Sequence, residues 1–435
     1  MISDLPAGWR RVRTETVASP DRYALATGPF GSAISSRHFI STGVPVIRGS
    51  NLSESVGTRL SHDKLVFISK ELAAKFQRSE VRRGDLVFTC WGTIGQVGLI
   101  DSTAEYKSYI VSNKQMKLTP DPSVADSLFL YYVFSSPEIV STIQSQKIGS
   151  SVPGFNLGQL KGIEIPLPPL DEQKRISGVL GELDEKIRLH RDMNRTLLAI
   201  GNAIFKSWFA RFDAVVAAEL TETEIGSIPS SWKIKPLLEI VDILSGGTPR
   251  TSNPNFWGGE LKWASAKDVS NCPDRYLIDT DRTITETGLS ASPTKVIPAG
   301  AVVVVARGAT CGRWCLMGEP IAMNQTCYAL VPRTPEFGNY TKYLIPALLD
   351  GLVRQAHGSV FDTITTRTFR SVRIPVPPAS LLARFDSVVE PLETRILENI
   401  YSSRTLARIR DSLLPRLIAG EVRVPEAFSQ LEDLS

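Results

Sequence analysis

The chain repeats itself with a period of 209 residues. The segment Ile163–Pro169 reads IEIPLPP and Val372–Pro378 reads VRIPVPP, so Ile165 and Ile374 lie 374 − 165 = 209 positions apart. Each proline run is followed by about forty residues with helical apolar spacing. A repeat of this length comprises a whole domain and a long helix. We therefore expect the order globule, helix, globule, helix, which suits a bipartite partner such as duplex DNA.

Length and hydropathy place the chain among folded proteins with more than one domain. It has 435 residues, of which 42% are apolar and 22% charged, too many for one ordinary core. No basic and apolar leader is present at the N-terminus, and no stretch approaches the roughly 20 apolar residues of a membrane span. The longest apolar run, 299–306, has the length of a strand. We expect a cytoplasmic protein.

The cysteines indicate neither a disulfide framework nor a metal site. There are five, scattered along the chain at Cys90, Cys272, Cys311, Cys315 and Cys327. A zinc site built from the last three with His357 would match no standard ligand spacing, and the first half has no counterpart. We expect buried thiols and no metal.

The positive charge is concentrated in the two globules. The net charge is only +4, but residues 1–168 carry 18 basic and 14 acidic side chains and residues 225–378 carry 16 and 12, which gives +4 for each. The remaining segments carry 15 and 19, which gives −4. This distribution favours a DNA footprint on the globules, although an excess of this size also fits an ordinary solvated surface.

The pattern of apolar residues predicts an α+β fold, in which two similar globular domains alternate with two long helices. Strands are expected at 44–48, 85–89 and 301–306. Helical stretches are expected around 127–146 and 339–355, where Pro137 and Pro346 should break or kink them. The predicted parts of the chain are a first globule (1–168), a first long helix with linker (169–224), a second globule (225–378), a second long helix (379–420) and a C-terminal tail (421–435).

Each predicted long helix has one apolar seam and needs a partner, so we expect the two to pair as an antiparallel coiled coil. Asp171 and Ser380 are the expected N-caps. Polar seam residues that would fix the register are His190, Asn194, Asn399 and Ser403. The predicted pairing residues are Ile176, Leu180, Leu183, Ile187, Leu197, Ile204, Leu382, Phe385, Val389, Leu392, Ile396 and Leu413. A plain amphipathic helix lying on its own globule is the alternative.

Signatures of catalysis are missing from the sequence. The dipeptide Gly-Lys does not occur, which excludes a phosphate-binding P-loop, and no strand is followed by Gly-x-Gly-x-x-Gly. Asn253-Pro-Asn-Phe256 departs from an amino-methyltransferase motif at its third position and is expected to form a turn. We predict that the chain has no catalytic residues and no cofactor of its own.

Several motifs together resemble one family. They are the run from Gly149 to Ile176 around IPLPPLDEQKRI, GPFGS at 28–32, GVPVIRGSN at 43–51, SGGTP at 245–249, FWGGE at 256–260, and Trp263 with Asp268-Val269. In combination they are similar to the specificity subunits of type I restriction–modification systems, over essentially the whole chain. The second junction departs from this pattern, because ASLLA at 379–383 replaces the LDEQK run.

The resemblance implies a non-catalytic subunit that determines DNA specificity. Each globule would be a target-recognition domain that reads one half of a bipartite site in double-stranded DNA. The paired helices would set the spacer and dock two methyltransferase subunits, which carry S-adenosylmethionine. Motor-nuclease subunits that use ATP and Mg would join for restriction. Two readers on one face of B-DNA need a separation of about one turn, roughly 34–36 Å, which a rigid helical spacer can hold.

Arg, Asn and Gln side chains recognise bases, and Lys contacts phosphates, so loops with these residues are the candidate contacts. In the first domain we predict Arg48, Asn51, Lys64, Thr93, Asn113, Lys114 and Lys147. In the second we predict Thr248, Arg250, Lys262, Lys267, Arg307, Asn324 and Gln325. For Trp91 and Trp257, packing in the core is the preferred interpretation. Two other functions stay open: a scaffold that binds only proteins, and a DNA-modifying enzyme with its own active site.

Overall fold

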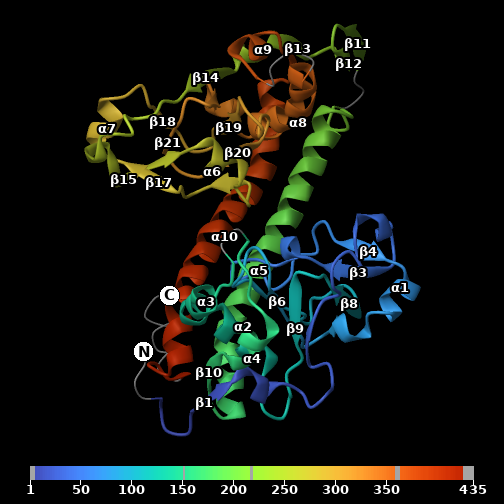
Figure 1. Cartoon of the computed structure of the whole chain (residues 1–435). Helices are drawn as coiled ribbons and strands as arrows, with labels where there is room; N and C mark the ends of the chain where they lie inside the picture. The colour runs from blue at the N-terminus through green and yellow to red at the C-terminus, as the bar shows by residue number, and fades with distance from the viewer. Residues whose placement is uncertain (1–4, 150–151, 216–218, 358–362, 425–435) are drawn as a thin grey trace. The chain divides into compact units, whose positions relative to one another are not determined.

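The computed structural model describes residues 5–149, 152–215, 219–357 and 363–424 (Figure 1). It divides into two units, of which the first joins Met1–Leu189 to Arg404–Ser435 and the second is His190–Ser403. Each unit contains one globule and a segment of both long helices. The predicted tail 421–435 lies outside the described residues beyond Val424.

The two long helices are α5 (Leu170–Phe209) and α10 (Ala379–Ala419), with 40 and 41 residues. Both begin directly after a pair of prolines. The amides of Glu172 and Gln173 donate to the carbonyl of Pro169 at 2.9 and 3.0 Å. Asp171 therefore lies inside the first turn, where its charge complements the helix dipole, and the prediction that it is the N-cap was wrong.

The second helix begins in the same way. The amides of Leu381 and Leu382 donate to the carbonyl of Pro378 at 2.9 and 3.2 Å. Ser380 is consequently a first-turn residue, and its prediction as a cap was also wrong. A proline fits the position before the first turn because its fixed φ continues into the helix and its missing N–H is not needed there.

The first globule consists of two four-stranded sheets with short helices. The sheets have the orders β2-β9-β6-β7 and β4-β3-β8-β5. Their strands are β2 (Leu25–Thr27), β3 (Val44–Ile47), β4 (Val66–Ile68), β5 (Glu80–Arg82), β6 (Leu86–Thr89), β7 (Val97–Leu99), β8 (Ser108–Val111) and β9 (Gln115–Leu118). The helices are α1 (Lys70–Ala74), α2 (Ser127–Ser135), α3 (Pro137–Ser145) and α4 (Leu157–Gly162). A separate ribbon pairs β1 (Arg10–Arg13) with β10 (Glu164–Leu167).

The second globule repeats this topology with one added edge strand, β16, in the orders β14-β22-β19-β20-β16 and β17-β15-β21-β18. The strands are β14 (Val241–Ser245), β15 (Trp257–Ala264), β16 (Tyr276–Leu277), β17 (Arg282–Ile284), β18 (Val296–Ile297), β19 (Val302–Val305), β20 (Trp314–Met317), β21 (Ile321–Met323) and β22 (Cys327–Pro332). The helices are α6 (Ala266–Ser270), α7 (Glu286–Ser290), α8 (Gly338–His357) and α9 (Thr366–Arg370). The ribbon partners here are β13 (Lys233–Pro236) and β23 (Arg373–Val376), and a hairpin of β11 (Leu220–Thr223) and β12 (Gly226–Pro229) precedes them.

The ladders confirm the period of 209 residues found in the sequence. Ile165 pairs with Val12 in the first ribbon, and Ile374 pairs with Lys235 in the second. The three predicted strands are present as β3, β6 and β19. Pro137 does break the predicted helix, since it is the first residue of α3. Pro346 lies inside α8, which continues through it, so no break occurs there.

The first unit contains an antiparallel contact between its segments of α5 and α10. Ile176, Leu180 and Leu183 of α5 share one apolar core with Leu413 of α10. Glu172 forms an ion pair with Arg423, beyond the end of α10, and Asp184 pairs with Arg410. As the residue number rises along α5 its partner's number falls, which defines the antiparallel direction. Ile187 is also buried.

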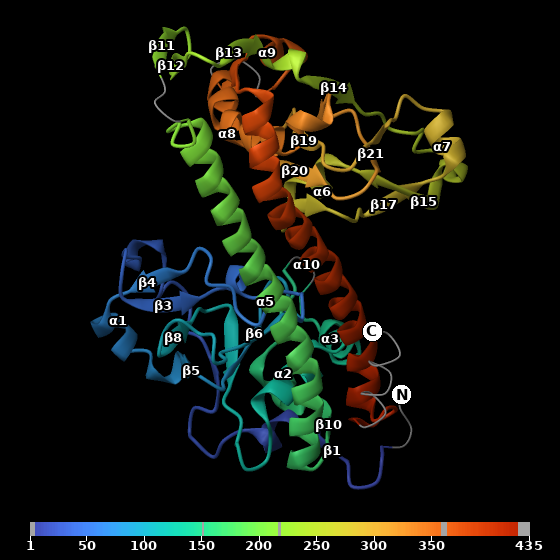
Figure 2. The same cartoon turned by 180° about the vertical axis from the view of Figure 1, so that it is seen from behind.

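The second unit contains the same antiparallel arrangement. Asn194 accepts a hydrogen bond from Asn399 at 2.8 Å and donates to the carbonyl of Ile396 at 3.2 Å. His190 lies 3.2 Å from the hydroxyl of Ser403. All four predicted polar seam residues therefore meet across the seam, and Figure 2 shows the helical segments of each unit side by side.

The apolar seam of the second unit agrees with the prediction except at one position. Leu197, Ile204, Leu382, Phe385, Val389 and Ile396 belong to its core or pack against it. Leu392 is only half-buried and lies outside that core. No helix among the described residues is long and apolar enough to cross a membrane.

Candidate nucleic-acid interface

Each globule brings three loops to one end of one of its sheets, β2-β9-β6-β7 in the first globule and β14-β22-β19-β20-β16 in the second. In the first globule, loop 28–34 follows β2, loop 90–96 follows β6 and turn 112–114 precedes β9. Because β9 is antiparallel to both β2 and β6, these three segments meet at the same end. The second globule places loop 246–250, loop 306–312 and turn 324–326 at the corresponding positions. We call these segments the tip loops.

The central turn has the same hydrogen bonds in both globules. The hydroxyl of Ser112 accepts from the amide of Lys114 at 3.4 Å, and the side-chain oxygen of Asn324 accepts from the amide of Thr326 at 3.2 Å. The carbonyls of Lys114 and Thr326 then accept from the amides of Cys90 and Ala306, both at 2.8 Å. The chain therefore crosses from the turn to the neighbouring loop in the same way in both globules.

The ladders show which residues of the two turns are equivalent, and Asn113 does not correspond to Asn324. Thr89 pairs with Gln115 in the first ladder, and Val305 pairs with Cys327 in the second. Counting back from Gln115 and Cys327, Asn324 takes the place of Ser112, whereas Asn113 takes the place of Gln325. Both Asn113 and Gln325 are exposed at the apex of the turn.

The first tip loop is fastened to that apex in each globule. The side-chain amide of Asn113 donates to the carbonyl of Gly31 at 3.0 Å, and the hydroxyl of Thr248 donates to the side-chain oxygen of Gln325 at 2.5 Å. The first tip loop of each globule starts with a glycine that packs against backbone atoms at the central turn. A Cβ on Gly28 would lie 1.8 Å from the carbonyl oxygen of Ser112, and no side chain fits there.

The second tip loop forms a bridge to the segment that enters the final helix of each globule. The carbonyls of Cys90 and Ala306 accept from the amides of Phe155 and Ile364, both at 2.9 Å. The next residues, Trp91 and Arg307, form isolated β-bridges with Gly154 and Thr363, respectively. Trp91 and Arg307 are therefore equivalent positions with different chemistry.

Asn51 does not belong to the exposed candidates. It is fully buried, its side-chain oxygen accepts from the amide of Arg48 at 3.0 Å, and its amide group donates to the carbonyls of Ser61 and Asp63 at 3.1 and 3.0 Å. Asp268 has the matching role, since it accepts from the amide of Ser265 at 2.8 Å. Asn51 therefore caps a turn, and we withdraw it as a base contact.

Lys262 and Lys267 have acidic partners. Half-buried Lys262 donates to the carbonyl of Ile278 at 2.7 Å and forms an ion pair with Glu319, which removes it from the candidate contacts. Lys267 is exposed but pairs with Asp281 at 2.8 Å.

The other candidates lie on or near the surface. Arg48 is half-buried and donates to the carbonyl of Lys64 at 2.7 Å. Thr248 and Asn324 are half-buried in the tip loops. The exposed candidates are Lys64, Thr93, Asn113, Lys114, Lys147, Arg250, Arg307 and Gln325.

The sequence interpretation missed two exposed aromatic residues. Phe30 has 82% of its surface exposed, and Trp91, which was predicted to pack in the core, has 47% exposed. The Gly-Pro before Phe30 and the glycine after each of them were the available signals, because glycine and proline place a residue on a turn. For Trp257 the expectation of packing agrees with the structure, since its ring lies 5.2 Å from that of Trp263, and Arg282 lies over it at 3.4 Å.

A buried carboxylate on a long helix fastens each globule. In the first unit, Asp184 of α5 accepts from the hydroxyl of Tyr132 and from Arg410, both at 2.6 Å, and Arg59 lies 3.6 Å away. In the second unit, Glu393 of α10 receives the guanidinium of Arg275 at 3.0 Å.

The hydroxyls of Tyr276, at 2.6 Å, and of Tyr343 also donate to Glu393. Burial raises the pKa of Tyr276, and the carboxylate raises it further. Burial by itself would raise the pKa of Glu393, but Arg275 and the two hydroxyls lower it below its ordinary value. The carboxylate is therefore held ionised inside the protein.

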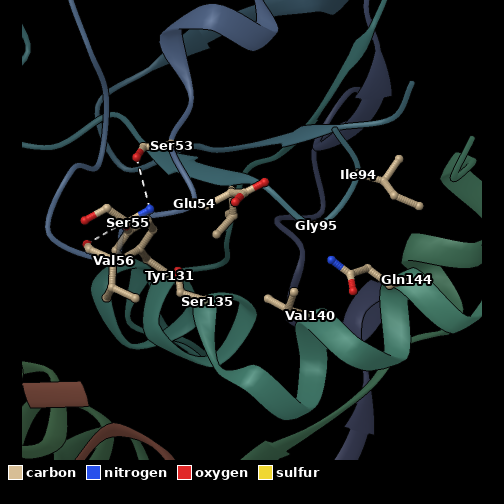
Figure 3. A pocket seen from close by; sticks show the side chains of 11 residues that line it. Ser53, Glu54, Ser55, Val56, Ile94, Gly95, Tyr131, Ser135, Val140 and Gln144 are labelled. Carbon is tan, nitrogen blue, oxygen red and sulfur yellow. Dashed lines mark hydrogen bonds between the residues drawn. The ribbon is translucent and has the colours of Figure 1, made fainter. Parts of the chain in front are cut away.

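A small pocket of about 150 Å³ lies beside loop 90–96 of the first globule (Figure 3). Ile94 and Gly95 line it from the loop, with Tyr131 of α2 and Val140 of α3 opposite. Glu54 is its one charged lining residue, and neither a histidine nor a cysteine lines it. This pocket lacks the paired acid and base, or nucleophile and base, that an active site requires. Among the described residues no cluster of histidine, cysteine and acidic side chains is arranged to hold a metal ion.

Comparison with known proteins identifies the class. The model of the type I restriction modification DNA specificity domain matches residues 32–199 and again 229–400. Two copies of one domain thus cover most of the chain, and the chain belongs to this family. The resemblance found in the sequence motifs is confirmed, and so are the α+β fold and the prediction of a specificity subunit that performs no catalysis itself.

Individual relatives match over most of their length. The specificity subunit of the type I restriction enzyme HindI from Haemophilus influenzae is 24% identical over 89% of this chain and 96% of its own. The MjaIX specificity subunit from Methanocaldococcus jannaschii is 25% identical over 79% of each chain. The crystal structure of the S subunit from M. genitalium has the same fold, with a TM-score of 0.59 at 15% identity over 95% of this chain and 96% of the other.

Proposed function

We propose that each globule reads one half of a bipartite site in double-stranded DNA and thereby directs a type I restriction–modification complex to its target. The tip loops are the reading surface. We propose recognition domains at 1–168 and 225–378 and spacer segments at 169–224 and 379–420, the boundaries expected from the sequence.

One observation carries this proposal: the central turn and the start of the second tip loop are held by the same backbone hydrogen bonds in both globules, whereas the side chains at equivalent positions of the tip loops differ. Trp91 corresponds to Arg307, Asn113 to Gln325 and Phe30 to Thr248. A reader of sequence needs a rigid frame that presents exchangeable side chains, because base identity is recognised by the chemistry of the side chain. Two domains that share the backbone of these loops but differ in their side chains are suited to recognise two different half-sites.

The proposed partners are those that the resemblance to the family implies. We propose that α5 and α10 set the length of the unread spacer and dock two methyltransferase subunits, which carry S-adenosylmethionine. ATP and Mg would belong to motor-nuclease subunits, where these are present. The polar seam, with Asn194 bonded to Asn399, supports a fixed helix register, since buried polar pairs specify alignment.

The proposal is tested by sequencing the methylome of a host that expresses this chain with its methyltransferase subunit. The expected result is one methylated motif made of two short half-sites and a constant gap. Exchanging residues 225–378 with those of a relative should change one half-site only. A continuous motif, or an exchange that changes both halves, would contradict the proposal.

The alternative of a protein-binding scaffold is separated by direct binding. A DNA reader binds random duplex with an affinity that falls linearly, on logarithmic scales, as salt rises, since each phosphate contact releases counterions. A scaffold shows no such dependence.

A further inference from the structure

We propose that the first globule contacts the bases of its half-site through an apolar surface formed by Phe30 and Trp91. This inference rests on the proposed function and adds the chemistry of recognition in one of the two domains. The ligand is the apolar part of the base pairs, namely thymine methyl groups and ring faces that become accessible where a base step is unstacked.

Phe30 is presented on a loop whose backbone is fixed. Gly28 lies against the carbonyl of Ser112, the carbonyl of Gly31 accepts from Asn113, and Gly31 has a φ of +58°. The Phe30 ring has 82% of its surface exposed on this loop. Covering the ring with a binding partner would remove its apolar surface from water, which is favourable. Because the loop backbone is already fixed, binding through this ring costs little conformational entropy.

Trp91 has the properties of a stacking platform. A Cβ placed on Gly154 would lie only 2.5 Å from ring atom Cζ3 of Trp91, so the indole packs on the backbone of that glycine. The amide of Gly92 also donates to the carbonyl of Pro153 at 3.0 Å. Nearly half of Trp91 stays exposed, and an indole supported from behind can receive a base on its open part.

The surroundings extend the apolar surface. Ile148 and Val152, in the segment that bridges to Gly154, are 48% and 51% exposed. Gly154 and Ile148 exchange two backbone hydrogen bonds of 2.8 Å. Four large apolar side chains on connected loops exceed the scattered exposure that is usual for a protein surface, and such groups mark a binding site.

The charged residues on these loops favour DNA as the partner that covers the apolar surface. The segments 28–34, 90–96, 112–114 and 146–154 contain Lys114 and Lys147 and not one aspartate or glutamate. An apolar surface on loops whose only charged residues are lysines matches the bases and phosphates of a duplex, and the nearby Glu54, which lines the pocket beside loop 90–96, comes from outside these segments. In the second globule the equivalent positions are Thr248 and Arg307, so this apolar contact belongs to the first half-site alone.

The test uses the full chain and two aromatic truncations. Duplexes are first selected from a random pool with the wild-type chain, and their dissociation constants are then measured across a range of salt for Phe30→Ala, Trp91→Ala and the wild type. Each truncation should weaken binding by about tenfold or more, because a base–aromatic stack has an effect of this size. The salt slope should not change, since no charge is removed, whereas Lys114→Ala should reduce it by about one.

Tyr23→Ala is the matched control, because this exposed ring precedes the other end of β2 and should leave binding unchanged. Phe30→Leu and Trp91→Phe keep an apolar side chain and should retain most of the affinity. Thermal midpoints of all variants establish that each one folds.

Two further measurements locate the contact. Replacing thymine by deoxyuridine in the first half-site removes the methyl group, and permanganate reports thymines that have become unstacked. A loss of affinity in the first case, or protein-dependent reactivity that requires Phe30 in the second, supports the contact. Truncations that bind DNA like the wild type but no longer co-purify with the methyltransferase would overturn it and assign the surface to a protein. If the wild-type chain selects no duplex, the proposed function fails as well.

Discussion

Asp184 and Glu393 occupy the same position in the two halves of the chain, 393 − 184 = 209 residues apart. Each lies 14 residues after the start of its long helix, since 184 − 170 and 393 − 379 are equal. Each carboxylate also forms an ion pair with an arginine from the globule of its own unit. The carbonyls of these arginines, Arg59 and Arg275, accept from Leu99 and Leu316 at 3.1 and 2.9 Å.

Leu99 and Leu316 are equivalent ladder positions, so the two arginines correspond as well. The duplicated unit therefore includes a buried anchor between globule and helix. Such an anchor fixes how a recognition domain sits on the helix of its own unit, because the arginine and carboxylate have few alternative partners in the interior.

Removing one member of this anchor should destabilise the second unit strongly. Glu393→Ala leaves Arg275, only 4% exposed, without its counter-ion, and breaking a buried pair in this way costs about 3–5 kcal/mol. Urea unfolding of the full chain measures the loss. Glu398→Ala on the same helix is the matched control, because its pair with Arg395 is exposed and should contribute less than about 1 kcal/mol. Equal effects of the two substitutions would show that the buried pair does not anchor the domain.

The same carboxylate predicts a dependence on pH. The pKa of Glu393 is lowered in the folded protein, so between its folded and unfolded pKa values the unfolded chain binds more protons. Stability from this group is therefore complete above the unfolded pKa and is lost as the pH falls through the folded value. Unfolding free energies of the wild type should decline below about pH 4.5, near the ordinary value for glutamate. Glu393→Gln should decline less over this interval, and parallel curves for the two proteins would contradict the linkage.

The sequence predicted the architecture well because its signals are local or periodic. The proline runs, the apolar seam and the polar residues from His190 to Ser403 each depend on spacing along one chain segment. The helix caps were predicted wrongly because Asp171 and Ser380 are good capping residues by type, while the preceding proline fixes the start of each helix two residues earlier.

The candidate interface was predicted less well, because it depends on contacts between distant segments. Nothing local distinguishes Asn51, which is buried between three backbone segments, from Asn113, which is exposed at the apex of a turn. The exposure of Trp91 depends on Gly154, 154 − 91 = 63 residues away. Residue type alone favours the core for tryptophan, and only the folded backbone shows the open part of its ring.

Arg307 should determine one position of the second half-site. It is exposed at the equivalent of Trp91, and a guanidinium that contacts a guanine bidentately contributes about 1–3 kcal/mol of discrimination. Arg307→Ala should relax the methylated motif at one base pair of that half-site and leave the first half-site unchanged, as read by methylome sequencing. Arg333→Ala, after the opposite end of β22, is the control and should retain the original motif. Relaxation in both half-sites, or in neither, would remove Arg307 from the reading surface.

The long helices should determine the spacer and not the half-sites. Seven residues inserted after Leu189, together with seven after Ser403, lengthen both helices by one heptad and preserve the apolar and polar seam on either side. The insertion adds about 10 Å of helix, equivalent to at most about three base pairs at 3.4 Å each. The methylated motif should gain a longer gap with identical half-sites. An insertion in one helix alone shifts the register, opposes Asn194 to a residue other than Asn399, and should abolish methylation. If the matched double insertion keeps the original gap, the helices do not set the spacer.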